Sequence, residues 1–280
     1  MTTTSAVTAQ SLGSTFATSE PALKDLLAEV SRGAVQLPDF QRPWVWEDHR
    51  IRALLASVSL SYPIGAVMLM QVGPETRFAP KPVAGVELAQ PVAPERLILD
   101  GQQRLTSLFM SLMSVRPVRT RKQKDKNEEI LRWYYLDMKA ALAEGADHED
   151  RVVSVVAVPE DKLVKADFDR TTVLDLTARE KECGAHYFPM NLMFDGVAVD
   201  EWFEAYQAVH GYSKDTSQFL NAFRREVLHP FSLYRVPVIE LLAGTRKEAV
   251  CQVFESVNTG GVSLTVFELV TASFAGSDFR

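Results

Sequence analysis

The chain has 280 residues, of which 46% are hydrophobic and 24% are charged, and its formal net charge is −6. This composition excludes collagen-like, disulfide-rich and wholly disordered proteins, and the length predicts one large domain or two modest ones. The negative charge makes the chain as a whole a poor electrostatic partner for nucleic acid. The two cysteines, Cys183 and Cys251, lie far apart without a CxxC pair, which argues against a zinc ribbon. Two isolated cysteines suit a protein of the reducing cytoplasm.

The N-terminal residues are rich in small hydroxyl side chains. Ten of the first twenty residues are Ser or Thr, which provides too little apolar surface to offset the entropy of ordering. We therefore expect a disordered tail over residues 1–18. Apolar residues from Leu23 to Val30 then follow the helical period and predict a first helix, with Ser19 as its cap.

A second helix is predicted over Glu47–Ser59 and a buried strand over Ile64–Val72. The stretch 53–74 contains no charged residue, but Pro63 and three serines interrupt it, so we do not expect it to span a membrane. Residues 73–95 contain five prolines and predict an excursion over the surface.

The next elements alternate between strands and helices. The short strand Arg96–Asp100 leads directly into a helix with an apolar face. Strands are also predicted over Trp133–Asp137 and over Arg151–Val158, because the latter is too rich in β-branched residues to prefer a helix. The region from about 160 to 230 is expected to be mainly helical.

The C-terminal part begins with an apolar run, Leu233–Leu242, whose proline confines it to a sheet edge or a strand start. A helix is predicted over Arg246–Val257, and a capping box at Thr265 and Glu268 predicts a last helix. Strands and helices without strict βαβ alternation indicate an α+β fold.

The pentapeptide DGQQR, which joins the strand to the helix, is the most distinctive segment. Unpaired N–H groups and the helix dipole make a helix N-terminus an anion site. Gly101 has no Cβ to keep a phosphate from the main chain, and Arg104 offers a guanidinium fork for phosphate oxygens. Gln102 and Gln103 could hydrogen-bond a nucleotide or hold a water, and Asp100 could position a metal ion or a water.

The same pentapeptide has a simpler interpretation. Asp100 could cap the helix with Gln103 at the capping-box position, and Arg104 could form an ion pair at the surface. The residues alone do not separate the two interpretations. If the anion site is correct, we expect Arg104→Ala to abolish nucleotide binding and to leave the melting temperature nearly unchanged.

Two other segments could contribute to a binding site. Arg42 lies among Phe40, Trp44 and Trp46, where it could stack on a ring or reach a phosphate. The alternative is aromatic core packing, with the arginine pointing to solvent. In the segment NTGG, Asn258 and Thr259 could contact a ligand from a helix end, or the segment could simply separate two helices.

A basic stretch lies between Arg116 and Arg132, with seven basic and three acidic residues. It could contact the phosphates of a nucleic acid, or it could be a solvated loop. The sequence contains no GxxxxGK[ST] phosphate loop, no GxGxxG motif and no HExxH motif, which argues against a P-loop enzyme and a zinc hydrolase.

Four segments in this order and spacing resemble the N-terminal domain family of GmrSD-type modification-dependent restriction systems, which includes phosphorothioate-sensing SspE-like proteins. The segments are PDFQRPWVW, PIGAVML, LILDGQQRLTSLF and VFESVNTGGVSLTVFEL. The resemblance covers about residues 20–275. It implies a ParB/sulfiredoxin-like core with helical additions. That nucleotide-binding domain would span 19–245, with a mainly helical insertion near 160–230, and 246–280 would start a C-terminal helical region.

The family binds nucleoside triphosphates, hydrolyses them in at least some members, and serves in defence against phage DNA. By motif, the resemblance gives catalytic roles to Asp100, Gln103 and Arg104. It gives nucleotide-binding roles to Gln41, Arg42, Gly101, Gln102, Asn258 and Thr259. Hydrolysis would need Mg²⁺ to offset phosphate charge, and Asp100 is a candidate to position it.

Family members usually continue into an HNH-type nuclease, but no HNH pattern occurs before Arg280. The expected partners are modified DNA and an HNH-type nuclease part or partner chain, without a membrane, and the chain could assemble into an oligomer. Two alternative functions stay open: a non-catalytic DNA-binding module that uses the basic stretch and residues 40–46, and a direct ParB-like nuclease.

Overall fold

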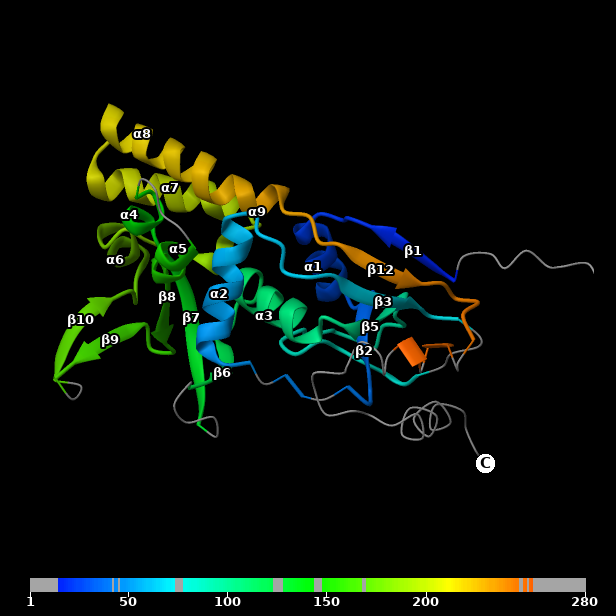
Figure 1. Cartoon of the computed structure of the whole chain (residues 1–280). Coiled ribbons are helices and arrows are strands. Elements are labelled where there is room, and N and C mark those ends of the chain that lie inside the picture. Colours follow the sequence, from blue (N-terminus) through cyan, green and yellow to red (C-terminus); the bar gives the residue numbers. More distant parts are fainter. Residues whose placement is uncertain are drawn as a thin grey trace, which may run out of the picture.

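The structure is a computed structural model, and it describes residues 15–41, 43–44, 46–73, 78–122, 128–143, 148–167, 170–246, 249–250 and 252–253. Over these residues the chain has an α+β fold. Two sheets lie at opposite ends of a central group of helices, and a pair of longer helices runs along the top of the view (Figure 1).

The larger sheet has six strands in the order β1-β12-β3-β5-β2-β4. Their bounds are Phe16–Ser19 (β1), Val238–Leu241 (β12), Val67–Gln71 (β3), Arg96–Asp100 (β5), Val35–Pro38 (β2) and Pro80–Lys81 (β4). β12 runs parallel to β3 and β2 parallel to β5, whereas the other neighbours are antiparallel.

Alternating side chains of this sheet enter two hydrophobic clusters. Val67, Leu69 and Ile98 belong to the main core, while Met70 and Leu97 belong to a smaller cluster on the other face. This division follows from the two-residue period of a strand.

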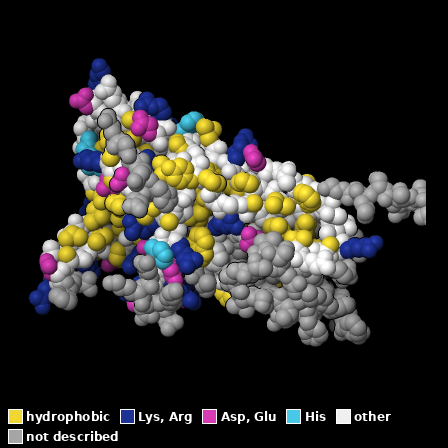
Figure 2. Space-filling view, viewed as in Figure 1, with side chains coloured by type: hydrophobic (Ala, Val, Ile, Leu, Met, Phe, Trp, Pro, Cys, Tyr) yellow, Lys and Arg dark blue, Asp and Glu magenta, His cyan; other side chains and the backbone are white. Residues whose placement is uncertain are grey.

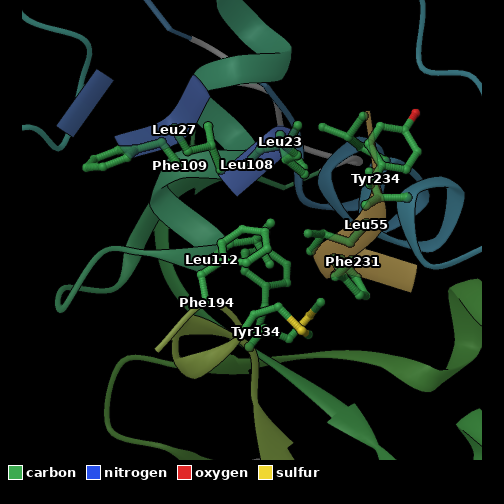
Figure 3. Packing of buried hydrophobic residues seen from close by; sticks show 14 of the residues in the cluster. Leu23, Leu27, Leu55, Leu108, Phe109, Leu112, Tyr134, Phe194, Phe231 and Tyr234 are labelled. Atoms are coloured by element: carbon green, nitrogen blue, oxygen red, sulfur yellow. The ribbon is translucent and has the colours of Figure 1, made fainter. Parts of the chain in front are cut away.

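Three helices bury their apolar faces in the main core: α1 (Leu23–Ser31), α2 (Asp48–Ser59) and α3 (Gln102–Leu112). Their buried leucines converge with aromatic side chains of later elements (Figure 3). The sequence predicted all three helices, because each has a continuous apolar face. None of the described helices is long and apolar enough to cross a lipid bilayer.

The second sheet and its flanking helices form the other end of the molecule. Its strands are β6 (Val118–Arg121), β7 (Glu129–Asp137), β8 (Val155–Pro159) and β11 (Tyr187–Pro189), beside a separate hairpin of β9 (Leu163–Ala166) and β10 (Thr171–Asp175). The accompanying helices are α4 (Met138–Ala141), α5 (His148–Ser154), α6 (Arg179–Gly184), η1 (Met190–Leu192), α7 (Gly196–His210), α8 (Lys214–Phe223), the π-helix η2 (Arg224–Leu228) and α9 (His229–Leu233).

Two predictions for the N-terminal region are wrong. Residues 16–18, which were expected in the disordered tail 1–18, form β1 together with Ser19 and pair with β12. Ser19 therefore does not cap α1, which begins after Ala22 without a side-chain cap. Cross-strand hydrogen bonds to β12 hold this segment despite its polar composition. Residues 1–14 lie outside the described residues.

The predicted strand Arg151–Val158 is wrong over its first half, which forms α5. A tertiary contact explains the change. Arg52 on α2 donates from Nη2 to the carbonyl of Val152 at 3.0 Å and from Nε to that of Val155 at 2.7 Å. A guanidinium that pairs with carbonyls at a helix C-terminus stabilises that helix against the β preference of its valines.

The prediction of mainly helical structure near 160–230 is correct for α7 and α8 and wrong for residues 163–175, which form the β9–β10 hairpin. The run Leu233–Leu242 contains β12, which lies inside the sheet and starts directly after Pro237, so its proline marks a strand start and not an edge. Of the helix Arg246–Val257, residues 249–250 and 252–253 are described and helical. The last predicted helix lies outside the described residues.

A pair of stacked histidines lies where α6 and α7 meet. The ring centroids of His186 and His210 are 4.5 Å apart, and Nδ1 of His186 lies 2.6 Å from the hydroxyl of Tyr206. Burial lowers the pKa of His186 below its usual 6.5, and the charges of Lys139 and His210 add to this effect. The unfolded chain therefore binds this proton more strongly than the folded chain does.

We expect the stabilisation from a neutral His186 to be present above its unfolded pKa of 6.5 and to be lost as the pH falls toward the lower folded-state pKa. Urea unfolding at about pH 7.5 and about pH 5.5 measures this loss. His186→Asn removes the titration and retains a residue that tolerates the φ of 64° at this position. The variant should lose less stability on acidification than the unmodified protein does. An equal loss in both proteins would show that His186 is not the source of the pH dependence.

Candidate functional site

A cavity of about 200 Å³ lies where β5 passes into α3. Its described lining consists of Gln41, Trp46, Leu99, Asp100, Gly101, Gln102, Gln103 and Arg104. The structure thus brings together six of the residues that the sequence predicted for a site. The other three, Arg42, Asn258 and Thr259, lie outside the described residues.

Gly101 forms the start of α3. Its φ of 90° is left-handed, and as the N-cap residue it has no side chain that could cap the helix. The amide of Leu105 donates to the carbonyl of Gly101 at 2.9 Å. The N–H groups of α3 before Leu105 have no acceptor within the helix, as in any α-helix. A Cβ on Gly101 would lie 3.1 Å from Cγ2 of Val67, so the tight turn needs glycine.

Arg104 bonds to protein atoms on two sides of the turn. Nη2 donates to Oδ2 of Asp100 at 2.9 Å and to the carbonyl of Ala66 at 3.1 Å, and Nη1 donates to the carbonyl of Ile64 at 2.6 Å. The capping interpretation of DGQQR is therefore wrong, because Gly101 is the N-cap and Arg104 does more than form a surface ion pair. A guanidinium has five N–H donors, so these contacts leave donors for a ligand.

Gly65 makes room for this arginine. Its φ is 85°, and a Cβ there would lie only 2.4 Å from Nη1 of Arg104. Any larger residue must displace the guanidinium or distort the loop before β3. The sequence contained Gly65 within the segment PIGAVML, but no local pattern connected it to an arginine 39 positions later.

Gln41 supports the cavity from a third segment. Its Nε2 donates to the carbonyl of Leu99 at 2.9 Å and, more weakly, to that of Ile98 at 3.3 Å. Gln41 is only 8% exposed. Its side chain therefore provides a donor for the carbonyls at the end of β5, where β2 no longer pairs with that strand. Lys81 holds the same turn by donating to the carbonyl of Gln41 at 2.6 Å.

The two tryptophans of this segment are held by hydrogen bonds to neighbouring elements. Trp44 donates from Nε1 to Oγ of Ser107 on α3 at 3.1 Å, and the carbonyl of Trp46 accepts from Oγ1 of Thr120 on β6 at 2.7 Å. Both tryptophans are partly buried against the main core. The core-packing alternative is therefore correct for these two rings, while Trp46 also lines the cavity.

A second cavity, of about 700 Å³, adjoins the same helix. Gln102 lines both cavities, and Met110 lines the larger one about two turns further along α3. The opposite wall comes from residues 81–87 and from β6 and β7. Sequence analysis described residues 73–95 only as a surface excursion, because this proline-rich segment offers no motif that would indicate a cavity wall.

The basic stretch 116–132 contains β6 and the start of β7, and four of its five described cations have acidic partners. Arg116 pairs with Glu87 at 2.6 Å, and Arg119 and Arg121 both pair with Glu129 at 3.7 Å. Basic and acidic side chains are likewise interspersed over the face shown in Figure 2. The predicted solvated loop is wrong for these strands, and the pairing offsets much of their positive charge.

Among the described residues, no group of three or more His, Cys, Asp and Glu side chains could together hold a metal ion. Asp100 is the one carboxylate in the described lining of the smaller cavity. Mg²⁺ is commonly bound through one or two protein carboxylates together with substrate phosphates. A magnesium ion that arrives with a triphosphate would therefore fit this donor set.

Comparison with known proteins gives two findings. The chain is 28% identical over 265 residues to a protein of Methanocaldococcus jannaschii named Uncharacterized protein MJ0686, and the match covers 90% of this chain and 41% of that relative. The chain therefore spans about two fifths of this relative's length. The family described as GmrSD restriction endonuclease, N-terminal domain, matches residues 23–275. Because this match covers most of the chain, the protein belongs to the GmrSD N-terminal domain family of restriction-system components.

Proposed function

We propose that this chain is a nucleoside triphosphate-binding and nucleoside triphosphate-hydrolysing regulatory domain of a modification-dependent DNA restriction system that defends against phage. The observation that supports this proposal most strongly is the smaller cavity at the N-terminus of α3. It places helix amides, the left-handed Gly101 and the guanidinium of Arg104 around one space.

The size and charge of this cavity suit the phosphate end of a nucleotide. Its volume of about 200 Å³ is below the roughly 300–1,000 Å³ typical of pockets that enclose a whole drug-sized ligand. Helix N-terminal amides and a guanidinium both favour a polyanion. The cavity would therefore hold phosphates, while the nucleoside extends beyond it.

The residues around the cavity have distinct parts in the proposed reaction. Arg104 and the first amides of α3 bind the phosphates, and the carboxamide of Gln103 orients a water. That water attacks the terminal phosphorus, the bond to the bridging oxygen breaks, and the products are a nucleoside diphosphate, inorganic phosphate and a proton. Asp100 would hold Mg²⁺, which would offset phosphate charge. Gln41 fixes the cavity wall through its bonds to β5.

The proposal extends to the assembly that the family implies. In this proposal the chain has a ParB/sulfiredoxin-like core. Its partners are modified DNA and an HNH-type nuclease, which is either a further part of the protein or a separate chain. A non-catalytic DNA-binding module is less well supported, because the two cations on β6, Arg119 and Arg121, are paired with Glu129. A direct nuclease also has less support than nucleotide binding, since no described constellation favours it as specifically as the cavity favours phosphate.

Gln103→Glu tests the proposal at the cavity itself. A carboxylate in the first turn of α3 interacts favourably with the helix dipole, so the melting temperature should stay equal or rise slightly. The same charge repels a polyphosphate, so calorimetry with each of the four common nucleoside triphosphates and Mg²⁺ should show affinity reduced by at least about tenfold.

Gln218→Glu on the exposed side of α8 is the matched control, since it makes the same charge change away from the cavity. Its nucleotide affinity should equal that of the unmodified protein. The proposal would be refuted if the unmodified protein bound no nucleoside triphosphate, or if Gln103→Glu left the affinity unchanged.

A further inference from the structure

The two cavities beside α3 differ in chemistry, although one residue lines both. The smaller cavity is lined mainly by polar groups at the helix N-terminus, and the larger one has a wall of apolar side chains that includes Leu37, Trp44 and Leu131. Gln102, which is 6% exposed, forms part of both linings. A ligand that begins at the helix N-terminus could therefore continue into the larger cavity past this side chain.

The larger cavity follows one side of α3. Gln102 and Met110 are eight residues apart, so they lie on the same face of the helix about 12 Å from each other. Its volume of about 700 Å³ falls within the range of pockets that enclose small organic ligands. The space is large enough for the rest of a nucleotide.

The charges around the larger cavity are balanced. Its described lining contains three basic residues and three acidic ones. Arg116 pairs with Glu87, and Arg119 pairs with Glu129. Lys81 donates to main-chain carbonyls. Such a lining does not favour a polyanion, but it suits a flat, neutral group that can form hydrogen bonds.

Trp44 adds an aromatic surface to this wall. Its indole N–H donates to Ser107, so the ring is held in position before a ligand binds. Aromatic side chains bind nucleobases by stacking, and a preorganised ring loses little entropy on binding.

We propose that the larger cavity is the nucleoside subsite of the nucleotide site, with the base against Trp44, the phosphates in the smaller cavity and Gln102 at the junction. This inference rests on the proposed function. It assigns recognition of the base to residues 81–87, Trp44 and β6–β7, none of which belongs to the DGQQR motif.

A variant that fills the larger cavity tests the two subsites separately. Ala84 is exposed and lines the larger cavity, so Ala84→Trp should fill that cavity with little effect on folding. Calorimetry compares two probes, the best-bound of ATP, GTP, CTP and UTP, and inorganic tripolyphosphate, each with Mg²⁺. We expect the variant to weaken nucleotide binding at least about tenfold and to change tripolyphosphate binding less than about twofold.

Trp44→Leu provides a second variant that removes stacking and keeps an apolar side chain. It should weaken nucleotide binding by roughly 5- to 100-fold and leave tripolyphosphate binding nearly unchanged. The matched control for Ala84→Trp is Ala208→Trp, at an exposed position of α7. This variant should bind both probes as the unmodified protein does.

The outcomes distinguish this inference from the function on which it rests. If the unmodified protein binds neither probe, the proposed function fails and the inference fails with it. If it binds both probes but Ala84→Trp and Trp44→Leu leave nucleotide affinity unchanged, or weaken both probes equally, the nucleoside subsite is wrong while the proposed function stands.

Discussion

Replacing Arg104 with alanine is expected to lower the free energy of unfolding by about 2–3 kcal/mol and to weaken nucleotide binding at least about tenfold. The variant removes three hydrogen bonds from a charged donor and leaves the carbonyls of Ile64 and Ala66 and the carboxylate of Asp100 without this partner. The side chains of Arg104 and Asp100 are only 20% and 34% exposed, so solvent compensates them incompletely.

Urea unfolding and calorimetry measure the two effects separately. Arg179→Ala is a suitable control, because its ion pair with Glu201 at 3.7 Å is exposed and should contribute less than about 1 kcal/mol. Arg104→Lys keeps the charge but loses the planar guanidinium. We expect its stability and its nucleotide affinity to lie between those of Arg104→Ala and those of the unmodified protein. A variant Arg104→Ala of unchanged stability would contradict the structural part of this account. This expectation replaces the one from the sequence, in which the anion-site interpretation left the melting temperature of Arg104→Ala nearly unchanged.

Gly65→Ala is expected to destabilise the protein by about 2–3 kcal/mol, although it adds only a methyl group. The backbone has a φ of 85° at this position, which costs a non-glycine residue about 1–2 kcal/mol. The added Cβ would also displace Nη1 of Arg104, so the hydrogen bond to Ile64 is lost as well.

The double variant tests whether these two residues act together. Once Arg104 is alanine, a Cβ at position 65 no longer meets the guanidinium, so only the backbone strain remains. We therefore expect the two destabilisations to sum to more than that of the double variant, by about 1 kcal/mol or more. Strict additivity in urea unfolding would show that Gly65 does not provide the space for Arg104.

Local patterns were sufficient to predict β5, α2 and α3. The strand Arg96–Asp100 is a short apolar run that ends at a glycine, and the observed bounds agree with the prediction. Asp100 to Arg104 could be recognised as a candidate anion site because strand, glycine and helix follow one another without a spacer. These features depend only on neighbouring residues.

Features that depend on distant residues could not be predicted in this way. Two of the three partners of Arg104 lie 38 and 40 residues earlier in the chain. The helix α5 forms where β-branched residues favour a strand, because Arg52, about 100 residues away, donates to the carbonyls of Val152 and Val155. The cavity wall at residues 81–87 comes from a segment without regular periodicity. Tertiary contacts decide each of these features, and no local pattern in the sequence encodes them.

The central claim is that the first main-chain amides of α3 bind a polyphosphate. The most direct test is an NMR titration of the unmodified protein with inorganic tripolyphosphate, which has no nucleoside to bind elsewhere. The account predicts that the amide resonances of Gly101, Gln102 and Gln103 shift saturably and more than those of the exposed helix α8. Resonances of these three amides that stay unchanged at saturating tripolyphosphate would contradict it.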